Sequence, residues 1–312
     1  MPHAEPHDVV DQCHVSIGVT TLNEARTIGR VLETLVAEAR SVGAELIVVA
    51  GGTDGTVEIV KGVLEKVESS TLIVEEKPSG KPAALNNLVS SARGEIVVLT
   101  DGDVLVSPGS ISLLINAFRN PTVGCACARV VGAPGEYNLV EQVCDWTAEI
   151  MSAGRRASYS QNGTVDLASG NLLAVRRSLF PVLPLDTMAD DGYISAWVRH
   201  SGYKIAYVEN AIVQTRYART LTDYLHQKSR TRLGHIQVER TFPDSAPRTA
   251  PNEFIEYFRT SRAVESRNYG LGIFAASIMM AGFAWLVAYS SSMVHRSGGR
   301  RGWRPIESTK TH

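Results

Sequence analysis

The sequence predicts an α/β protein with a mostly parallel central sheet, and three observations lead to this fold class. The 312 residues, 44% of them hydrophobic, suffice for one large domain or two smaller ones with a sizeable core. Apolar runs typical of buried strands occupy residues 15–20, 45–50, 71–75 and 95–100. Helical periodicity separates these runs, at residues 25–39, 56–67 and 82–92. Strands and helices that alternate in this way form parallel strands joined by right-handed crossovers.

After residue 108 the pattern is looser but still alternates. We expect helices at 109–118, 191–200 and 222–237, and strands at 124–131 and 172–176. These elements predict a single domain at residues 14–240, with a nucleotide-binding half (14–104) and an acceptor half (105–240). A polar tail at 1–13 precedes it, and a proline-rich linker at 241–251 leads to an amphipathic helix at 252–267.

Composition excludes some classes of function. The net charge is -1, which gives no general case for nucleic-acid binding. The four cysteines lack the C-x-x-C spacing of a zinc or redox site, so we interpret them as buried free thiols in a reducing compartment. Residues 1–12 are polar and contain no apolar core of a signal peptide.

The C-terminal part of the chain predicts membrane association. Residues 268–294 carry no charge and are long enough to cross a bilayer, although a buried core helix is the alternative. Basic residues follow at 295–312, which places this tail in the cytoplasm. A re-entrant segment would keep the catalytic domain on the cytoplasmic side as well, whereas a single span would not. Small residues at four-residue spacing within the segment also allow a homo-oligomer.

The triplet Asp101-Gly102-Asp103 follows the fourth predicted strand directly. Its carboxylates therefore leave the C-terminal edge of the sheet, where open α/β folds bind ligands. Asp-Gly sequences also form ordinary turns. Two carboxylates separated by a glycine can reach one hard cation such as Mg²⁺ or Mn²⁺, which tolerates a diphosphate as co-ligand. Asp103 and Asp101 are our candidate metal ligands.

Three more strand-end loops carry groups that suit a nucleotide. Thr21, Asn23 and Glu24 lie at the end of the first strand and are candidates for contact with the nucleotide, where Asn23 and Glu24 can hydrogen-bond a base or ribose. The alternative for Asn23 is that it caps the next helix. Asp54 follows the second strand, with the same helix-capping alternative. Lys81 follows the third strand and offers a point charge for phosphate, unless it is a solvated surface lysine.

A second group of polar residues lies in the later half. Ser169, Gly170 and Asn171 precede a predicted strand, and Asp190 and Asp191 open a predicted helix. Neighbouring carboxylates repel, which raises the pKa of one of them toward the range of a general base. Acidic residues also stabilise a helix N-terminus, and both roles are compatible.

In this order, these motifs resemble those of an inverting family 2 glycosyltransferase of GT-A fold, over about residues 14–235. The resemblance implies that Asp103 and Asp101 hold Mn²⁺ or Mg²⁺ and the donor, and that Asp191 is the base. It also relates Gln227 and Arg230 to the Gln-x-x-Arg-Trp motif of cellulose- and hyaluronan-type synthases, where they would contact the donor diphosphate.

Two departures from the family pattern matter. Thr231 replaces the tryptophan of that motif, which weakens any claim to processive synthesis. Val49 and Ala50 replace an Asp-Asp pair of which one member reads uracil, so base recognition falls to other residues. By resemblance we still expect a UDP-sugar donor, with guanosine donors open.

The expected function is transfer of a sugar from a nucleotide-sugar donor to a lipid-linked or surface-polysaccharide acceptor. A polyprenyl-phosphate sugar synthase is one alternative. A catalytically inactive, membrane-tethered sugar-binding scaffold is another, although the retained carboxylates argue against it. A sugar-phosphate nucleotidyltransferase would need a glycine-rich loop with an arginine after the first strand, and Thr20-Thr-Leu-Asn-Glu24 lacks it.

Overall fold

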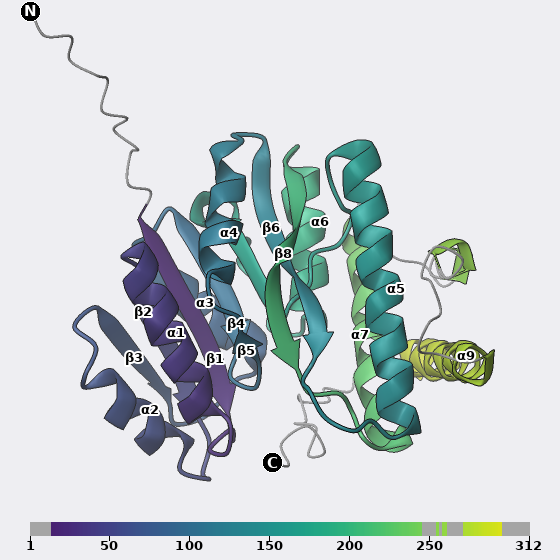
Figure 1. Ribbon diagram of the computed structural model, residues 1–312, viewed down its shortest axis with the longest axis horizontal. Helices are drawn as coiled ribbons and strands as arrows, with labels where there is room; N and C mark the ends of the chain where they lie inside the picture. Colours follow the sequence, from purple (N-terminus) through teal and green to yellow (C-terminus); the bar gives the residue numbers. More distant parts are fainter. Residues whose placement is uncertain (1–13, 245–253, 256–257, 261–270, 295–312) are drawn as a thin grey trace, which may run out of the picture.

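The computed structural model describes residues 14–244, 254–255, 258–260 and 271–294, and confirms the predicted α/β fold (Figure 1). Its first half alternates strand and helix as expected. The elements of this half are β1 (Val15–Leu22), α1 (Ile28–Val42), β2 (Glu45–Gly51), α2 (Thr56–Leu64), β3 (Ser70–Glu75), α3 (Lys81–Ser91) and β4 (Ile96–Asp101).

The second half begins at β5 (Leu105–Val106), a two-residue strand. The further elements are α4 (Ser110–Asn116), β6 (Val123–Gly132), α5 (Leu139–Asn162), β7 (Leu172–Arg176), α6 (Asp190–His200), β8 (Lys204–Thr215), α7 (Leu221–Thr241) and α9 (Leu271–Val294). Short 3-10 turns follow α4 and β7, at Ala117–Arg119 and Arg177–Leu179.

One sheet of eight strands runs through both halves in the order β3-β2-β1-β4-β7-β6-β8-β5. The four strands from β3 to β4 are parallel, as the crossover helices require. Strand β7 is antiparallel to both β4 and β6, and β5 is antiparallel to β8, whereas β6 and β8 are parallel. The carboxyl ends of β1, β2 and β4 therefore meet at one edge.

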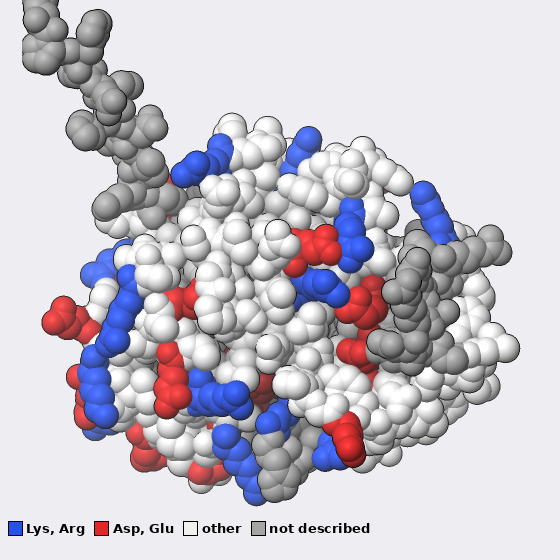
Figure 2. All heavy atoms as spheres, viewed as in Figure 1, with Lys and Arg blue, Asp and Glu red and all other residues white. Residues whose placement is uncertain are grey.

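Helices cover both faces of the sheet and enclose two cores. Helices α1, α2 and α4 pack on one face, around Ile28, Leu32 and Ile111. Helices α3 and α6 pack on the other, around Leu88 and Ile194. Cys125, Cys127 and Cys144 are buried free thiols, as predicted, whereas Cys13 lies outside the described residues. Charges of both signs are scattered over the face that Figure 2 shows, in keeping with the net charge.

Two long elements have no counterpart in our sequence analysis. Helix α5 begins with a capping box, in which the side chain of Asn138 accepts from Glu141 N at 3.0 Å and Glu141 accepts from Asn138 N at 3.0 Å. An asparagine followed three residues later by a glutamate is the sequence signal that could have located the start of this helix. Strand β8 is harder to detect because polar Glu209 and Asn210 interrupt its apolar alternation, close to a register shift against β6.

Helix α9 coincides with the uncharged segment predicted at 268–294. The segment Leu271–Ser292 is long enough to cross a membrane and has a mean hydropathy of 2.0, but length and composition alone are weak grounds for a span. It packs against α5 and α7 in Figure 1. Most of the predicted linker and of the amphipathic helix at 252–267 falls outside the described residues, although 254–255 and 258–260 are helical.

The amino-terminal edge of the sheet is held by Glu45, whose side chain is 9% exposed. Its carboxylate accepts from Ser16 Oγ at 2.6 Å, and from Arg93 N and Nε at 2.7 and 3.0 Å. Burial by itself would raise the pKa of Glu45, but the hydrogen bonds from Ser16 and Arg93 outweigh it and lower the pKa below 4.5. This one carboxylate thus joins β1, β2 and the start of β4.

We expect Glu45→Ala to lower the free energy of unfolding by about 1–3 kcal/mol, because it leaves a buried hydroxyl and a backbone N–H without their acceptor. Urea unfolding at pH 7 measures the loss, with exposed Glu68→Ala as the control. Since the pKa of Glu45 is lowered on folding, its stabilisation is complete above the unfolded pKa and is lost as the pH falls through the folded one. An equal difference between wild type and variant at pH 7 and pH 3 would contradict this role.

Candidate active site

The candidate site lies at the carboxyl ends of β1 and β4, where Asp101 is opposite Thr20. Asp101 is the last residue of β4, and the turn that follows is held by a hydrogen bond from Gly102 N to Thr20 O at 3.1 Å. A Cβ on Gly102 would lie 2.6 Å from Thr21 Oγ1, so only glycine fits between the two aspartates. The buried hydroxyl of Thr21 therefore lies beneath this turn.

Asn23 and Asp54 connect the loops after β1 and β2. Asn23 has a φ of 54° and accepts from Thr53 N through Oδ1 at 2.9 Å. Asp54 Oδ2 accepts from Ala25 N at 3.0 Å, and its Oδ1 accepts from Thr56 N at 3.1 Å. Burial by itself would raise the pKa of Asp54, but these hydrogen bonds lower it. Because α1 is capped at Thr27 rather than Asn23, the helix-capping alternative for Asn23 is wrong.

Acidic side chains crowd the turn of Asp101-Gly102-Asp103. Burial, together with the charges of Asp101 and Glu24, raises the pKa of Asp103 from 3.8 to about 7. Glu24 is itself buried, and its Oε2 accepts from Thr27 Oγ1 at 3.1 Å. Thr27 also donates to Gly102 O at 3.1 Å, which ties α1 to the turn. An excess of negative charge therefore surrounds Asp103.

Lys81 joins the two halves of the site. Its Nζ lies 2.9 Å from Asp101 Oδ1 and 3.1 Å from Asp190 Oδ2. Burial by itself would lower the pKa of Lys81, but the charges of Asp101 and Asp190 outweigh it and raise the pKa well above 10.5. The ammonium group is brought into position by Gly80, whose φ of 101° suits glycine. Lys81 is thus a mostly buried cation, with 22% of its side chain exposed, between the predicted donor and acceptor sides, and not a solvated lysine.

Asp191 lies in the first turn of α6, and its Oδ1 accepts from Gly192 N at 2.8 Å. Burial and the charge of Asp190 raise the pKa of Asp191 above 3.8. Gly170 lies directly against it, since a Cβ there would be 3.2 Å from Asp191 Oδ2. The predicted Ser169-Gly170-Asn171 motif and the candidate base are therefore neighbours. Asn171 also holds the end of β4, because its carbonyl oxygen accepts from Thr100 Oγ1 at 2.8 Å.

The loop before Asp190 is fastened from two helices. On α3, the Asn86 amide exchanges two hydrogen bonds with the backbone of Leu183, both at 2.9 Å. On α7, Gln237 accepts from Met188 N at 3.2 Å. Gly234 lies so close that a Cβ there would be 2.5 Å from Ala189 Cβ. Sequence analysis assigned no role to Asn86 or Gln237, because nothing in their spacing identifies a partner 97 or 49 residues away.

Gln227 and Arg230 lie on α7, less than two turns before Gly234. Both are half-buried, and Thr231, which stands where the motif has tryptophan, donates to Gln227 O at 3.0 Å. Their helix thus contacts the loop that carries the candidate base, and their contact with the donor diphosphate stays a prediction.

The carboxylates suit a hard cation, although they do not form a complete cage. Within the described parts of the chain, no group of three or more His, Cys, Asp or Glu side chains could hold a metal ion unaided. Asp103 and Asp101 nevertheless offer oxygen ligands in a site with excess negative charge, which a divalent cation would neutralise. The remaining ligands would have to be water or phosphate oxygens, as Mg²⁺ sites commonly use.

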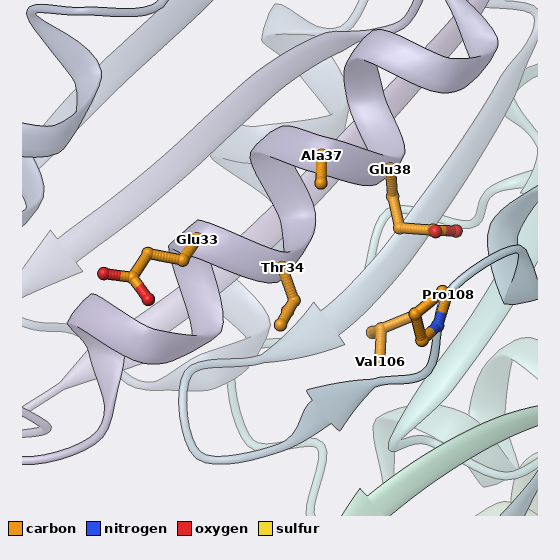
Figure 3. A pocket seen from close by; sticks show the side chains of 6 residues that line it. All are labelled: Glu33, Thr34, Ala37, Glu38, Val106 and Pro108. Carbon is orange, nitrogen blue, oxygen red and sulfur yellow. The ribbon is translucent and has the colours of Figure 1, made fainter.

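A separate cavity of about 290 Å³ lies between α1 and the segment after β5. It is lined by Glu33, Thr34, Ala37, Glu38, Val106 and Pro108 (Figure 3). The Glu38 carboxylate already accepts from Gly109 N at 2.7 Å and Ile111 N at 3.0 Å, so it fixes the start of α4. No predicted site residue lines this cavity.

The chain resembles several solved structures. It superposes on a mannosyltransferase from Pyrobaculum calidifontis in complex with GDP-Man and Mn²⁺ with a TM-score of 0.57 and 22% identity, over 91% of this chain and 81% of that one. The TM-score is 0.53, with 17% identity, for glucosyl-3-phosphoglycerate synthase from Mycobacterium tuberculosis with Mn²⁺ and UDP, over 78% of this chain and 87% of that one. These similarities show a GT-A fold.

The chain is also similar in sequence to curated proteins. An N-acetylglucosaminyltransferase from Rhizobium leguminosarum bv. viciae is 23% identical over 215 residues, which cover 65% of this chain and 49% of the relative. A cholesterol galactosyltransferase from Borreliella burgdorferi is 25% identical over 122 residues, or 39% of this chain and 34% of the relative. The chain thus spans about half the length, or less, of these relatives. Residues 12–234 match the model of the "Glycosyltransferase like family 2", and the chain therefore belongs to this family of glycosyltransferases.

Proposed function

We propose that this glycosyltransferase moves a sugar, with inversion and in the presence of Mn²⁺ or Mg²⁺, from a nucleotide sugar to a lipid-linked or surface-polysaccharide acceptor. The observation that carries the proposal is the position of Lys81, within ion-pair distance of both Asp101 and Asp190. Lys81 therefore lies between Asp101, a predicted metal ligand, and Asp190, the residue next to the predicted base. A binding scaffold would have no need for a carboxylate of raised pKa at each side.

The donor side is formed by the loops after β1 to β4. Asp103 and Asp101 would hold the divalent cation, which would neutralise charge on the departing diphosphate. Glu24 lies near Asp103, and Asn23 lies in the same loop after β1; both are our candidates for contact with the ribose or base. A UDP-sugar is the donor we expect. Because the mannosyltransferase from Pyrobaculum calidifontis was solved with GDP-Man, GDP-sugars belong in the same test.

On the acceptor side, Asp191 would accept the proton of the attacking hydroxyl. Its raised pKa favours this, since a base with a pKa nearer neutrality takes a proton more readily. The hydrogen bond from Gly192 N and the contact with Gly170 fix the orientation of the carboxylate. Ser169, Asn171 and Asp190 would line the acceptor side. If the acceptor is a polyprenyl phosphate, it is already ionised and needs little help from a base.

The location of the reaction is part of the proposal. We infer that the enzyme is membrane-associated through α9, with the catalytic domain on the cytoplasmic side, where nucleotide sugars are made. Hydrolysis of a panel of UDP- and GDP-sugars, with and without Mn²⁺, tests the whole assignment. Failure to turn over any donor would favour the inactive scaffold.

We expect Asp191→Asn to lower turnover by about 10²–10⁴-fold while donor affinity is kept, because only proton acceptance is lost. Asp103→Ala should instead remove the Mn²⁺-dependent part of donor binding, as measured by calorimetry. Asp186→Asn, an exposed change in the loop before α6, is the control for both. Near wild-type turnover of Asp191→Asn with a hydroxyl acceptor would show that another group is the base, or that the acceptor needs none.

Lys81→Met should lower turnover by about 10²-fold or more, because two half-buried carboxylates lose their shared cation. The matched control is Lys77→Met, four residues earlier and exposed. Steady-state kinetics and thermal unfolding together separate a lost catalytic arrangement from a lost fold. Equal activity of the two variants would show that Lys81 is only a solvated charge.

The pH profile offers an independent measurement. Because Asp191 must be ionised to act and its pKa is raised, kcat should fall on the acid side at a pH above the usual range of an aspartate. Asp190→Asn removes one cause of the raised pKa, so the acid limb should move to lower pH. A limb that stays in place or moves upward would contradict the coupling between Asp190 and Asp191.

A further inference from the structure

Helix α9 is apolar on every side, yet protein covers only one side of it. Six of its described residues are buried, namely Ser277, Ala281, Ala284, Trp285, Ala288 and Ser292. Others are well exposed, namely Leu271 (83%), Met279 (68%), Phe283 (54%) and Leu286 (66%). At 3.6 residues per turn the exposed positions fall within an arc of about 120°, and the buried ones lie on the opposite arc. The helix thus has a docked face and an apolar open face.

The docked face contacts the catalytic domain along most of the helix. Near its start, Ile273 and Phe274 pack against Trp146 and Ile150 of α5. Near its end, Trp285 and Ala288 pack around Ile236 of α7. These contacts cover about four turns, so the helix lies along the domain.

A charged group reinforces the docking. The Arg232 guanidinium of α7 is 5.5 Å from the centre of the Trp285 ring, a cation–π distance, and Arg232 is 5% exposed. Arg232 is thus a buried charge at the contact between α7 and α9.

Because α9 is docked on the domain, its orientation relative to a bilayer is restricted. With 24 residues the helix is about 36 Å long, which is enough to cross the hydrocarbon core. A crossing helix would draw the neighbouring parts of α5 and α7 into that core, with Asp145, Glu149 and Arg232. Each charge at the centre of a bilayer costs at least about 2.5–3.5 kcal/mol. A docked α9 therefore cannot cross.

We propose that α9 lies in the plane of a membrane surface, with its docked face on the catalytic domain and its open face among lipid acyl chains. Interfacial helices normally have a polar face of their own, and here the catalytic domain takes that place. The part of the molecular edge near α9 that is visible in Figure 2 shows no charged side chain.

The sequence beyond α9 fits a lipid partner with an anionic headgroup. Residues 295–312 contain five Lys and Arg and a single acidic residue, Glu307. Basic segments of this kind bind anionic membranes. A second copy of the chain would not use this charge, because that segment would meet its own positive counterpart. The proposal holds whatever the donor or acceptor is, since it depends on α9 alone.

Flotation of the full chain with preformed vesicles tests the contact. Vesicles of phosphatidylcholine with about 30% phosphatidylglycerol, a typical anionic fraction, should carry the protein. Met279→Glu together with Phe283→Glu should lower the partition coefficient by about tenfold or more. Leu113→Glu, an exposed change on α4, is the control. If the double variant unfolds in a thermal melt, the single variant Leu286→Gln replaces it.

Labelling of the two helix ends tests the orientation. Gly272→Cys and Ser290→Cys are exposed positions near opposite ends of α9, and the described native thiols are buried. In a Cys13→Ser background, a membrane-impermeant maleimide should modify both ends to the same extent, and more slowly in vesicle-bound than in free protein, because both positions lie on the open face. Protection of one end would mean a span and would overturn the proposal.

A dimer is the other outcome to measure. If light scattering shows a dimer that Met279→Glu dissociates, and wild type does not float with vesicles, the open face is covered by a second copy and the proposal is wrong. Unchanged flotation of the Met279→Glu, Phe283→Glu double variant would also overturn it. The flotation, labelling and light-scattering measurements do not require turnover. A failure of this proposal can therefore be distinguished from a failure of the proposed reaction.

Discussion

The geometry of the site depends on one mostly buried cation. Lys81 lies within 3.1 Å of oxygens on both Asp101 and Asp190, which belong to elements on either side of the site. Without the ammonium group, a site that also contains Asp103, Asp191 and Glu24 would hold several carboxylates, and only the charge of Arg155 near Asp191 would offset them. Mutual repulsion would then protonate some of them or separate the loops. The lysine thus allows the proposed metal ligands and the proposed base to lie in one small region.

Rigid backbone contacts support this electrostatic arrangement. Glycines at 102 and 234 allow the chain to approach closer than any side chain would permit, and Gly170 leaves room for a close contact with Asp191. They bring the β4 turn to β1, the Ser-Gly-Asn loop to Asp191, and α7 to the loop before α6. Hydrogen bonds from Asn86 and Gln237 hold the same loop. The base is therefore presented by a segment fixed from three sides, as a catalytic carboxylate requires.

The packing of the C-terminal helix also bears on the position of the protein at a membrane. Because α9 is docked on α5 and α7, which also reach the acceptor half, the position of the domain relative to a lipid surface follows from its packing. Length and hydropathy alone would suggest a crossing helix. The cost of moving charged neighbours into hydrocarbon outweighs that suggestion and favours a helix that lies flat. An acceptor held in the same membrane would then meet the site in a restricted orientation.

The sequence by itself determined the α/β class and the first four strands, and it supplied the candidate site residues, because short strands and turn motifs are local patterns. It also predicted the apolar helix at the C-terminus. Only the tertiary structure showed the pairing of Lys81 with both Asp101 and Asp190, the contact of Gly170 with Asp191, and the two faces of α9. The physical reason is sequence distance: each of these contacts joins residues far apart in the chain, or depends on what covers a surface, and no local pattern encodes a partner.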